Sequence, residues 1–364
     1  MSPLSRKEFL RLAAAGTLAG ASAVALNACG VKEAATGASV TASPLASPSQ
    51  TAAPTETAAP PTKTPAATAT PAPTATFEPT ATATPEPGPD LVVAHNGEPE
   101  ELVRRAIAAM GGMEQFVFKG ANVIVKPNIC VDFRTYEWAA TTNPWVVGTL
   151  VRMAFEAGAA SVRVMDQTWQ RNMTEAYARS GIQEQVEAAG GVMEWMPLDK
   201  FVNTPVPQGV ELKEIGIYDE ILKADVVINV PIAKHHESAK LTLGMKNLMG
   251  IISNRPAMHD SDVTTFGTIF GHRIADLVSV VRPTLNVMDA VRVMMDGGPT
   301  GFSLKQVKKA DTIIVSRDIV ALDSYTTGLF EMKPEDLPYV TVATERGLGR
   351  SDLATLRIEE FNVR

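Results

Sequence analysis

A window near the middle of the chain, residues 229–259, concentrates the side chains that could do chemistry. It holds three of the five histidines and, after Val230, four cationic side chains against the single acid Glu237. The chain as a whole is acidic, with a formal net charge of −7. Cations and imidazoles that follow an apolar strand are suited to bind an anion or a metal-bound anion. The four cations are Lys234, Lys240, Lys246 and Arg255.

Three side chains of this window are candidates for catalysis. Lys246 lies in an apolar run between Gly244 and Gly250. Its amine therefore either reaches water at the end of an apolar stem or is buried with a lowered pKa that suits base or Schiff-base chemistry. We expect a simpler role, a cation held against a substrate carboxylate or phosphate. His235 and His259 are candidates for general acid–base catalysis.

A metal site is a second interpretation of the same histidines. Successive residues of a strand face opposite sides, so at most one of His235 and His236 should point into the pocket unless the backbone turns. A divalent metal would therefore need help from His259 or from a carboxylate such as Asp289 or Asp166, and the candidate ligands are His235, His259 and Asp289. The alternative is that the histidines are hydrogen-bonding loop residues, and both interpretations stay open at this level.

Polar side chains at the ends of other apolar runs should complete the pocket. Lys126 and Asn128 end one run, Asp166 another and Asn229 a third. Ligands of parallel sheets collect at the carboxyl ends of strands, although Lys126 is equally well explained as a surface lysine beside a turn. The glycine-rich residues 297–301 could hold an anion with backbone amides or form an ordinary flexible loop. The predicted ligand contacts are Lys126, Asn128, Lys234, Asn247, Arg255, Gly297 and Gly298.

The elements that must position these side chains follow an alternating pattern. Apolar runs rich in Val and Ile predict strands at residues 91–94, 123–126, 161–165, 226–230, 285–288 and 312–315. Helical patterns between them predict helices at residues 98–110, 144–157, 174–189, 270–281 and 319–329. This alternation predicts an α/β fold, with a mainly parallel sheet covered by helices on both faces, in one unit or two lobes. The proline-spaced residues 193–213 should form a loop with short strands, either a lid or an inserted hairpin.

The N-terminal residues predict an exported protein. Residues 1–29 combine a basic start, an apolar run too short to span a membrane comfortably, and a Leu-Asn-Ala-Cys ending similar to a lipobox, in which Cys29 is lipidated. Residues 5–10 resemble a twin-arginine signal with lysine in the second arginine position, so the Tat and Sec export routes both stay open. Residues 30–89 consist largely of Ala, Thr, Pro and Ser, which predicts a disordered tether to an α/β body at 90–364.

The distribution of charge and cysteine limits the function classes. Residues 1–29 contain three basic residues and one acid, and residues 30–89 two basic residues and four acids, so the −7 falls on the body. An acidic body lacks the basic face that binds phosphates, so we expect no nucleic acid partner. With Cys29 lipidated, Cys130 is alone, which excludes a cysteine zinc site or an iron–sulfur cluster within this chain.

Taken together and in order, several motifs resemble the family of the domain of unknown function numbered 362. The motifs are Lys126-Pro127-Asn128, Thr141-Thr142-Asn143-Pro144, Asn229-Val230-Pro231 with Lys234 and His235, Lys246-Asn247-Leu248-Met249-Gly250, His259, Asp289, Gly297-Gly298-Pro299 and Ala321-Leu322-Asp323. The resemblance covers nearly all of the body and implies a fold and a shared polar crevice, but no assigned reaction. Some relatives carry ferredoxin-like cysteine repeats that this chain lacks. A more distant similarity is to the nickel-dependent lactate racemase group, whose cofactor we do not carry over.

Two functions are compatible with these features. The first is an extracytoplasmic enzyme, lipid-anchored at the cell membrane, that acts on a small anionic substrate with or without a divalent metal. The second is a tethered protein that captures a ligand or metal without turning it over. In both, contact with the membrane is through the lipid anchor only.

Overall fold

The computed structural model of the protein describes residues 88–169, 172–259 and 266–364. The predicted export signal, the lipidation site Cys29 and almost all of the predicted tether lie outside these residues. The predicted body is described from its first strand to the last residue of the chain, apart from residues 170–171 and 260–265. No helix in the described ranges is long and apolar enough to cross a membrane.

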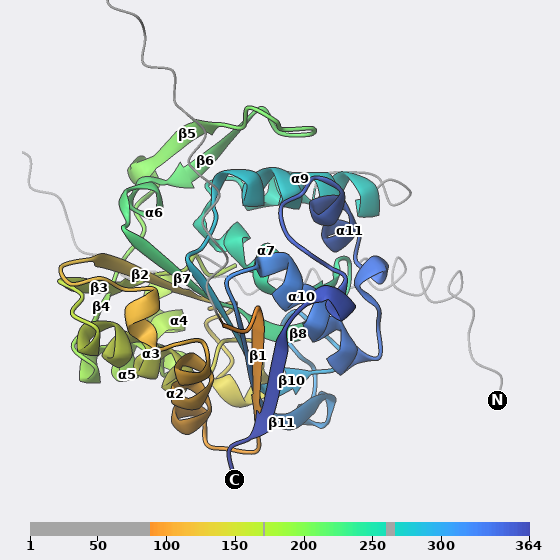
Figure 1. The fold of residues 1–364 in the computed structure, drawn as a ribbon. Helices are drawn as coiled ribbons and strands as arrows, with labels where there is room; N and C mark the ends of the chain where they lie inside the picture. Colours follow the sequence, from red (N-terminus) through yellow and green to blue (C-terminus); the bar gives the residue numbers. More distant parts are fainter. Residues whose placement is uncertain (1–87, 170–171, 260–265) are drawn as a thin grey trace, which may run out of the picture. The chain divides into compact units, whose positions relative to one another are not determined.

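A ten-stranded sheet forms the centre of the body, with strands in the order β12-β1-β11-β10-β7-β2-β3-β4 (Figure 1). β8 pairs with β10, and β9 extends the sheet from β8. The strands are β1 (Leu91–His95), β2 (Asn122–Pro127), β3 (Ser161–Val164), β4 (Val192–Met193), β7 (Val226–Val230), β8 (Ile232–His236), β9 (Lys240–Thr242), β10 (Leu285–Met294), β11 (Val307–Ser316) and β12 (Ile358–Asn362). Most pairings are parallel, and the antiparallel ones are β1 with β11, β10 with β11 and β8 with β9. The predicted mainly parallel α/β fold is confirmed.

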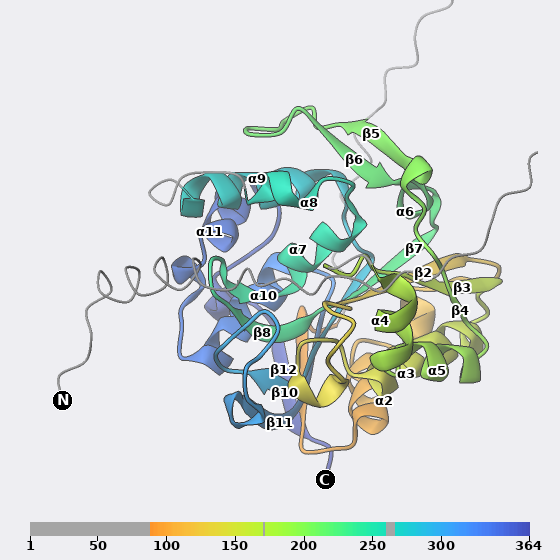
Figure 2. The same ribbon diagram turned by 180° about the vertical axis from the view of Figure 1, so that it is seen from behind.

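Helices cover both faces of this sheet. They are α2 (Pro99–Ala109), α3 (Pro144–Glu156), α4 (Met173–Arg179), α5 (Ile182–Ala188), α6 (Asp219–Lys223), α7 (Gly244–Asn247), α8 (Arg255–Met258), α9 (Phe266–Val280), α10 (Ile319–Thr327) and α11 (Pro338–Glu345). Figure 1 and the reverse view in Figure 2 show α2, α3 and α5 on one side, and α7 and α10 on the other with α9 and α11 outside them.

The central strands explain why the polar residues converge. All five residues of β7 are buried, as expected for a strand covered on both faces. β2 and β7 are parallel and in register, so Lys126 at the end of β2 lies beside Asn229 at the end of β7. Because parallel strands end at the same edge of the sheet, the polar groups that follow them gather there.

The structure differs from the sequence predictions in several places, and the helices α6, α7, α8 and α11 are among the elements that were not predicted. The helix predicted at 174–189 is divided into α4 and α5 at Gly181, whose φ of +75° suits a left-handed glycine. Three short strands, β8, β9 and β12, escaped prediction because their residues are mixed polar and charged rather than apolar. A single large sheet is present, so the two-lobe alternative is wrong for the described body.

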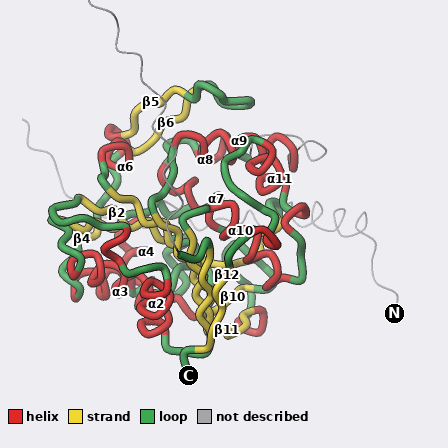
Figure 3. Tube along the Cα trace, viewed as in Figure 1, coloured by secondary structure: helices red, strands yellow, loops and turns green. Residues whose placement is uncertain are grey.

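The proline-spaced segment forms most of an inserted hairpin. β5 (Phe201–Pro205) pairs antiparallel with β6 (Glu214–Tyr218), and Figure 3 shows this pair apart from the large sheet. The buried carboxylate of Asp276 in α9 accepts hydrogen bonds at 2.9 Å from the amides of Val210, Glu211 and Leu212 in the connecting loop. Asp276 therefore holds this loop against α9. Of the two predictions for the segment, lid or hairpin, the hairpin is confirmed.

Candidate functional site

A cavity of about 1040 Å³ opens at the carboxyl ends of β2 and β3 and between β8, α7 and α8. It is lined by Lys126, Asn128, Cys130, Asp166, Gln167, Trp169, Lys234, His236, Glu237, Ser238, Thr242, Lys246, Asn247, Met249, Gly250, Arg255, Pro256, His259, Phe266, Gly298, Pro299, Thr300 and Phe302. The lining contains four Lys and Arg side chains against two carboxylates. Most of the predicted ligand contacts are therefore brought together, from segments far apart in the sequence.

Lys126 is fully engaged within the protein. Its Nζ lies 2.7 Å from Asp166 Oδ1 and donates hydrogen bonds to Pro127 O at 2.8 Å and Asn247 Oδ1 at 3.0 Å. The other oxygen of Asp166 accepts a hydrogen bond from the amide of Ile129 at 2.6 Å. Burial lowers the pKa of Lys126, and the neighbouring Asp166 carboxylate opposes that shift. Two hydrogen bonds and a buried ion pair therefore hold the Lys126 amine, which gives the cavity charge.

Lys234 is engaged in the same way. Its Nζ donates to Asn128 Oδ1 at 3.0 Å, Ala140 O at 2.6 Å and Pro299 O at 3.2 Å. Its side chain is buried, and burial lowers its pKa. Lys234 therefore ties β8 to the loops that follow β2 and β10, while its charge faces the cavity.

A chain of amide side chains connects these two lysines. Asn247 Oδ1 accepts from Lys126 Nζ and from Asn128 Nδ2, both at 3.0 Å, and Asn247 Nδ2 donates to Asn229 Oδ1 at 2.8 Å and to Lys126 O at 3.2 Å. Asn128 in turn accepts from Lys234. A buried polar network that is satisfied throughout makes its members rigid. Asn128 and Asn247 line the cavity, but their hydrogen bonds hold the site together.

Asp323 explains how α7 is placed. Its two oxygens accept hydrogen bonds from the amides of Gly244 at 2.6 Å and Met245 at 2.9 Å, the first residues of α7. Burial raises the pKa of Asp323 to about 7, and these two amide hydrogen bonds act in the opposite direction. A carboxylate from α10 therefore positions the helix that carries Lys246 and Asn247.

Lys246 is the exception among the lysines of the cavity. Lys246 is only 9% exposed, and its Nζ lies 6.0 Å from the centre of the Phe270 ring. Within residues 88–169, 172–259 and 266–364, no hydrogen bond or ion pair engages its Nζ. Burial, followed by the charges of Lys234, Arg255 and Lys126, lowers its pKa to about 7. Near neutral pH, a large fraction of this amine is therefore uncharged and carries a free electron pair.

The structure places His236, rather than the predicted His235, in the cavity wall. Side chains alternate along β8, so Lys234 and His236 share one side and His235 points to the other, where its Nδ1 accepts a hydrogen bond from the amide of Gly298 at 3.1 Å. The ring of His236 stacks on that of His259, with centroids 5.8 Å apart and planes at 5°. At most one of the two histidines was expected to face the cavity; His236 lines it and His235 does not.

Both cavity histidines are held in the neutral form at neutral pH. Burial and the adjacent Lys246 lower the pKa of His236 far below its ordinary value, and the same two causes lower that of His259 to about 4. His259 also stacks on Phe270, with centroids 5.0 Å apart. The pair thus forms part of an uncharged aromatic wall next to the Lys246 amine.

The predicted metal ligands are not brought together. Asp289 lies in β10 outside the cavity, where its oxygens accept from the amides of Asn143 at 2.7 Å and Val291 at 3.0 Å, and burial raises its pKa to about 6. His235 faces away from the cavity, so His259 is the one predicted metal ligand of His235, His259 and Asp289 that lines it. Among the described residues, no group of three or more His, Cys, Asp or Glu side chains is arranged to hold a metal ion.

The predicted backbone cradle at Gly297 and Gly298 is also absent from this arrangement. The amide of Gly297 donates a hydrogen bond to Asp296 Oδ1 at 2.7 Å, and the amide of Gly298 donates one to His235 Nδ1 at 3.1 Å. Arg255, the remaining predicted contact, lines the cavity and donates to Gln167 O at 2.8 Å and Thr168 O at 2.6 Å. It joins α8 to the loop after β3 and contributes charge at the cavity.

Three of the lining residues that were not predicted have unusual environments. Thr242 is 3% exposed, and its hydroxyl has no hydrogen-bond partner in the described part of the chain. Trp169 and Phe302 are 67% and 79% exposed, which is unusual for such large apolar side chains. Nothing local in the sequence separates these residues from ordinary strand or loop residues, so only their position beside the cavity reveals them.

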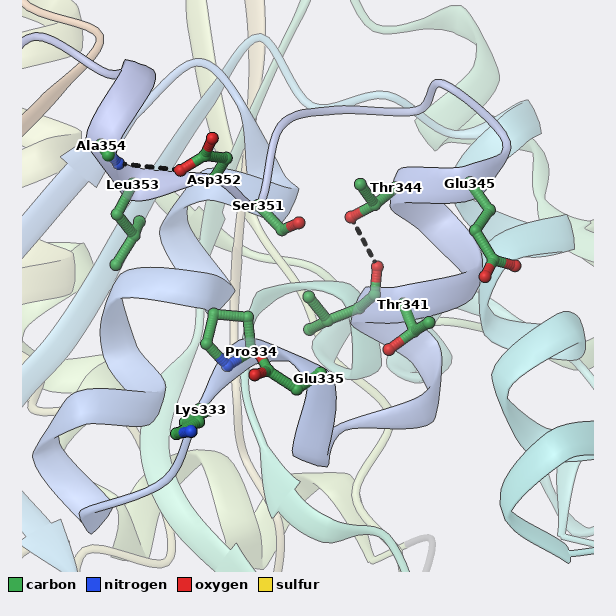
Figure 4. Close-up of a pocket in the computed structure, with 11 residues that line it drawn as sticks. Lys333, Pro334, Glu335, Thr341, Thr344, Glu345, Ser351, Asp352, Leu353 and Ala354 are labelled. Atoms are coloured by element: carbon green, nitrogen blue, oxygen red, sulfur yellow. Dashed lines mark hydrogen bonds between the residues drawn. The ribbon is translucent and has the colours of Figure 1, made fainter.

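A second cavity, of about 600 Å³, lies between α11 and the loops around it (Figure 4). Figure 4 shows Lys333 and Glu335 on one side and Ser351 and Asp352 on another. It contains none of the predicted site residues. The larger cavity is therefore the candidate functional site.

Comparisons with known proteins give similarities to one curated protein and to solved structures, and they identify a family. A thylakoid-associated protein of Synechocystis sp. is 24% identical over 262 residues, which cover 69% of this chain and 75% of that protein. Among solved structures, the lactate racemase apoprotein of Thermoanaerobacterium thermosaccharolyticum is 15% identical with a TM-score of 0.41, covering 61% of this chain and 53% of that one. A Thermotoga maritima protein is 13% identical with a TM-score of 0.36, covering 68% of this chain and 60% of that one. The model of the DUF362 family, a domain of unknown function, matches residues 123–328, and the chain belongs to that family.

Proposed function

We propose that the large cavity binds a small organic anion and that the protein is an enzyme that acts on it, with Lys246 as the reactive amine. The observation that carries this proposal is the contrast between three buried lysines. Lys126 makes two hydrogen bonds and an ion pair within the protein and Lys234 makes three hydrogen bonds, whereas no hydrogen bond or ion pair within the described residues engages Lys246. An unengaged buried amine in a cavity is costly unless a ligand uses it.

The surrounding charges favour an anion. Lys126, Lys234 and Arg255 are held in place and direct positive charge at the cavity, and a bound carboxylate or phosphate would reduce their mutual repulsion. The anion would also raise the pKa of Lys246 towards its ordinary value, so binding near neutral pH should be accompanied by proton uptake. Within this proposal, His259 and His236 form the cavity wall next to the Lys246 amine. The reaction is assigned to Lys246 and not to a metal because the predicted metal ligands do not lie together.

The test is to replace Lys246 with methionine, which keeps the length of the side chain but removes the amine. Acetate, lactate, pyruvate and phosphate should be screened for thermal stabilisation of the wild-type protein. We expect Lys246→Met to lower the affinity for the anion that stabilises wild type by roughly ten- to a hundredfold, since a hydrogen bond to a charged group contributes about 1.5 to 3 kcal/mol. The matched control is Lys308→Met, because Lys308 is exposed and lies outside the cavity lining.

An anion that stabilises wild type and Lys246→Met equally would contradict the assignment. Prolonged incubation of wild type with the stabilising anion, followed by mass spectrometry of the solution, separates catalysis from simple capture. Chemical conversion that depends on Lys246 supports an enzyme. Recovery of an unchanged ligand supports the alternative of a tethered binding protein.

We further propose that the body is held outside the cytoplasm through lipidated Cys29 and that it binds no nucleic acid. The lipobox-like ending of residues 1–29, the Thr- and Pro-rich residues that follow and the acidic body support this proposal. The Synechocystis relative is named thylakoid-associated, which is a property of that protein. In cells, Cys29→Ala should move the protein from the membrane fraction to the soluble fraction. Unchanged membrane retention of this variant would argue against lipid anchoring.

A further inference from the structure

We propose that Lys246 forms an imine with the carbonyl group of its ligand, so that the ligands of this cavity are small anions that carry an aldehyde or ketone. This inference rests on the proposed function and narrows its substrate class. An amine that serves only as an anion contact works best when it is fully charged and hydrogen-bonded. The environment of Lys246 favours the opposite condition.

The first requirement for an imine is an unprotonated and unengaged nitrogen. Lys246 is more than nine-tenths buried, and no hydrogen bond in the described part of the chain orients its Nζ. Its pKa is lowered to about 7, while an ordinary lysine has a pKa of about 10.4. At pH 7, the unprotonated fraction of Lys246 is therefore roughly a thousandfold larger than that of a surface lysine. A desolvated lysine beside other cations is the arrangement that activates this side chain as a nucleophile.

The second requirement is a way to place the carbonyl carbon next to the amine. Arg255, Lys126 and Lys234 line the same cavity and are close enough to Lys246 for their charges to affect its pKa. Because internal hydrogen bonds hold them, they provide a fixed positive region for a carboxylate or phosphate. A carbonyl group adjacent to that anionic group would then lie near Lys246.

The third requirement concerns protons and the departing water. The Lys246 nitrogen attacks the carbonyl carbon, a C–N bond forms, and one proton passes from nitrogen to the carbonyl oxygen to give a carbinolamine. That oxygen leaves as water with the second amine proton, and the C=N bond forms without any oxidation or reduction. The unpartnered hydroxyl of Thr242 and the neutral ring of His259 lie in the same cavity wall and are the groups that can relay these protons.

Reductive trapping tests this inference directly. The full chain would be incubated at pH 7 with glyoxylate or pyruvate and then with sodium cyanoborohydride, which converts an imine to a stable secondary amine. We expect one dominant adduct, mapped to Lys246 by peptide mass spectrometry and at least tenfold enriched over any surface lysine. The adduct should be lost in Lys246→Met and in Lys246→Arg, and retained in Lys308→Met. Circular dichroism of each variant confirms that it is folded.

The Lys246→Arg variant separates the two proposals. It keeps a cation in the cavity but cannot form an imine, so thermal stabilisation by the probe should persist in part while trapping disappears. If the probe stabilises wild type and the stabilisation is lost in Lys246→Met, but no adduct is enriched at Lys246, the imine is overturned and the anion site stands. If the probes neither stabilise wild type nor react, and the simple anions also have no effect, both proposals fall.

Discussion

The clearest stability prediction concerns Gly250, a residue without a side chain at the point where the buried ion pair needs room. A Cβ added to Gly250 would overlap Asp166 Oδ1 and would lie 2.7 Å from Lys126 Nζ and 2.9 Å from Lys126 Cε. Both partners are almost fully buried, with side chains 1% and 3% exposed. The added Cβ would push Asp166 Oδ1 away from Lys126 Nζ, so we expect Gly250→Ala to separate the pair.

The size of the effect follows from the burial of both charges. Breaking a buried ion pair costs about 3 to 5 kcal/mol because an uncompensated charge is left inside the protein. At about 2 °C per kcal/mol for a chain of this size, Gly250→Ala should lower the melting temperature by roughly 6 to 10 °C. It should also weaken anion binding, because Lys126 and the Asn247 network form one wall of the cavity.

The assay is thermal unfolding of Gly250→Ala beside a matched glycine variant. A Cβ at Gly328 would meet no atom within 4 Å, and Gly328 has an ordinary helical backbone with φ −59°. Gly328→Ala should therefore melt within about 1 °C of wild type. If Gly250→Ala melts as high as Gly328→Ala, the ion pair does not hold this region and our account of the cavity wall is wrong.

Three further predictions concern individual groups of the site. Lys246 has a lowered pKa in the folded state, so the folded protein binds fewer protons than the unfolded chain between about pH 7 and pH 10.5, and the stability of the wild-type protein should rise with pH across that range. Lys246→Met should be more stable than wild type in urea titrations without ligand. This difference should be largest at or below pH 7 and should shrink towards pH 10. Asp323→Asn keeps one acceptor oxygen but turns an NH₂ group towards an amide of α7, so it should lower the free energy of unfolding by about 1 to 3 kcal/mol in denaturant titrations, and an unchanged midpoint would contradict its role in placing α7. Cys130 lines the cavity, so a stabilising anion should slow its labelling by N-ethylmaleimide several-fold, whereas an equal rate with and without the anion would place the ligand elsewhere.

Much of the fold is readable from the sequence because its signals are local. Continuous apolar runs such as residues 226–230 can be buried only in a covered strand, and the helices between them favour parallel pairing. The gathering of Lys126, Asp166 and Lys234 near one edge follows from that topology, because parallel strands all end on the same side. The position of the pocket was therefore predictable, together with its surplus of positive charge.

The roles of individual side chains within the pocket depended on contacts that no local pattern contains. Lys126, Lys234 and Lys246 look alike in the sequence, yet the partners of Lys126 include a side chain 121 residues away and those of Lys234 a side chain 106 residues away. His235 and His236 are distinguished only by the side of β8 on which each falls, and that side is set by the pairing of β8 with β10 and β9. Sequence alone determined the α/β scaffold and the location of a cationic crevice; tertiary structure decided which amine stays unengaged, because burial and hydrogen bonding arise only when distant segments meet.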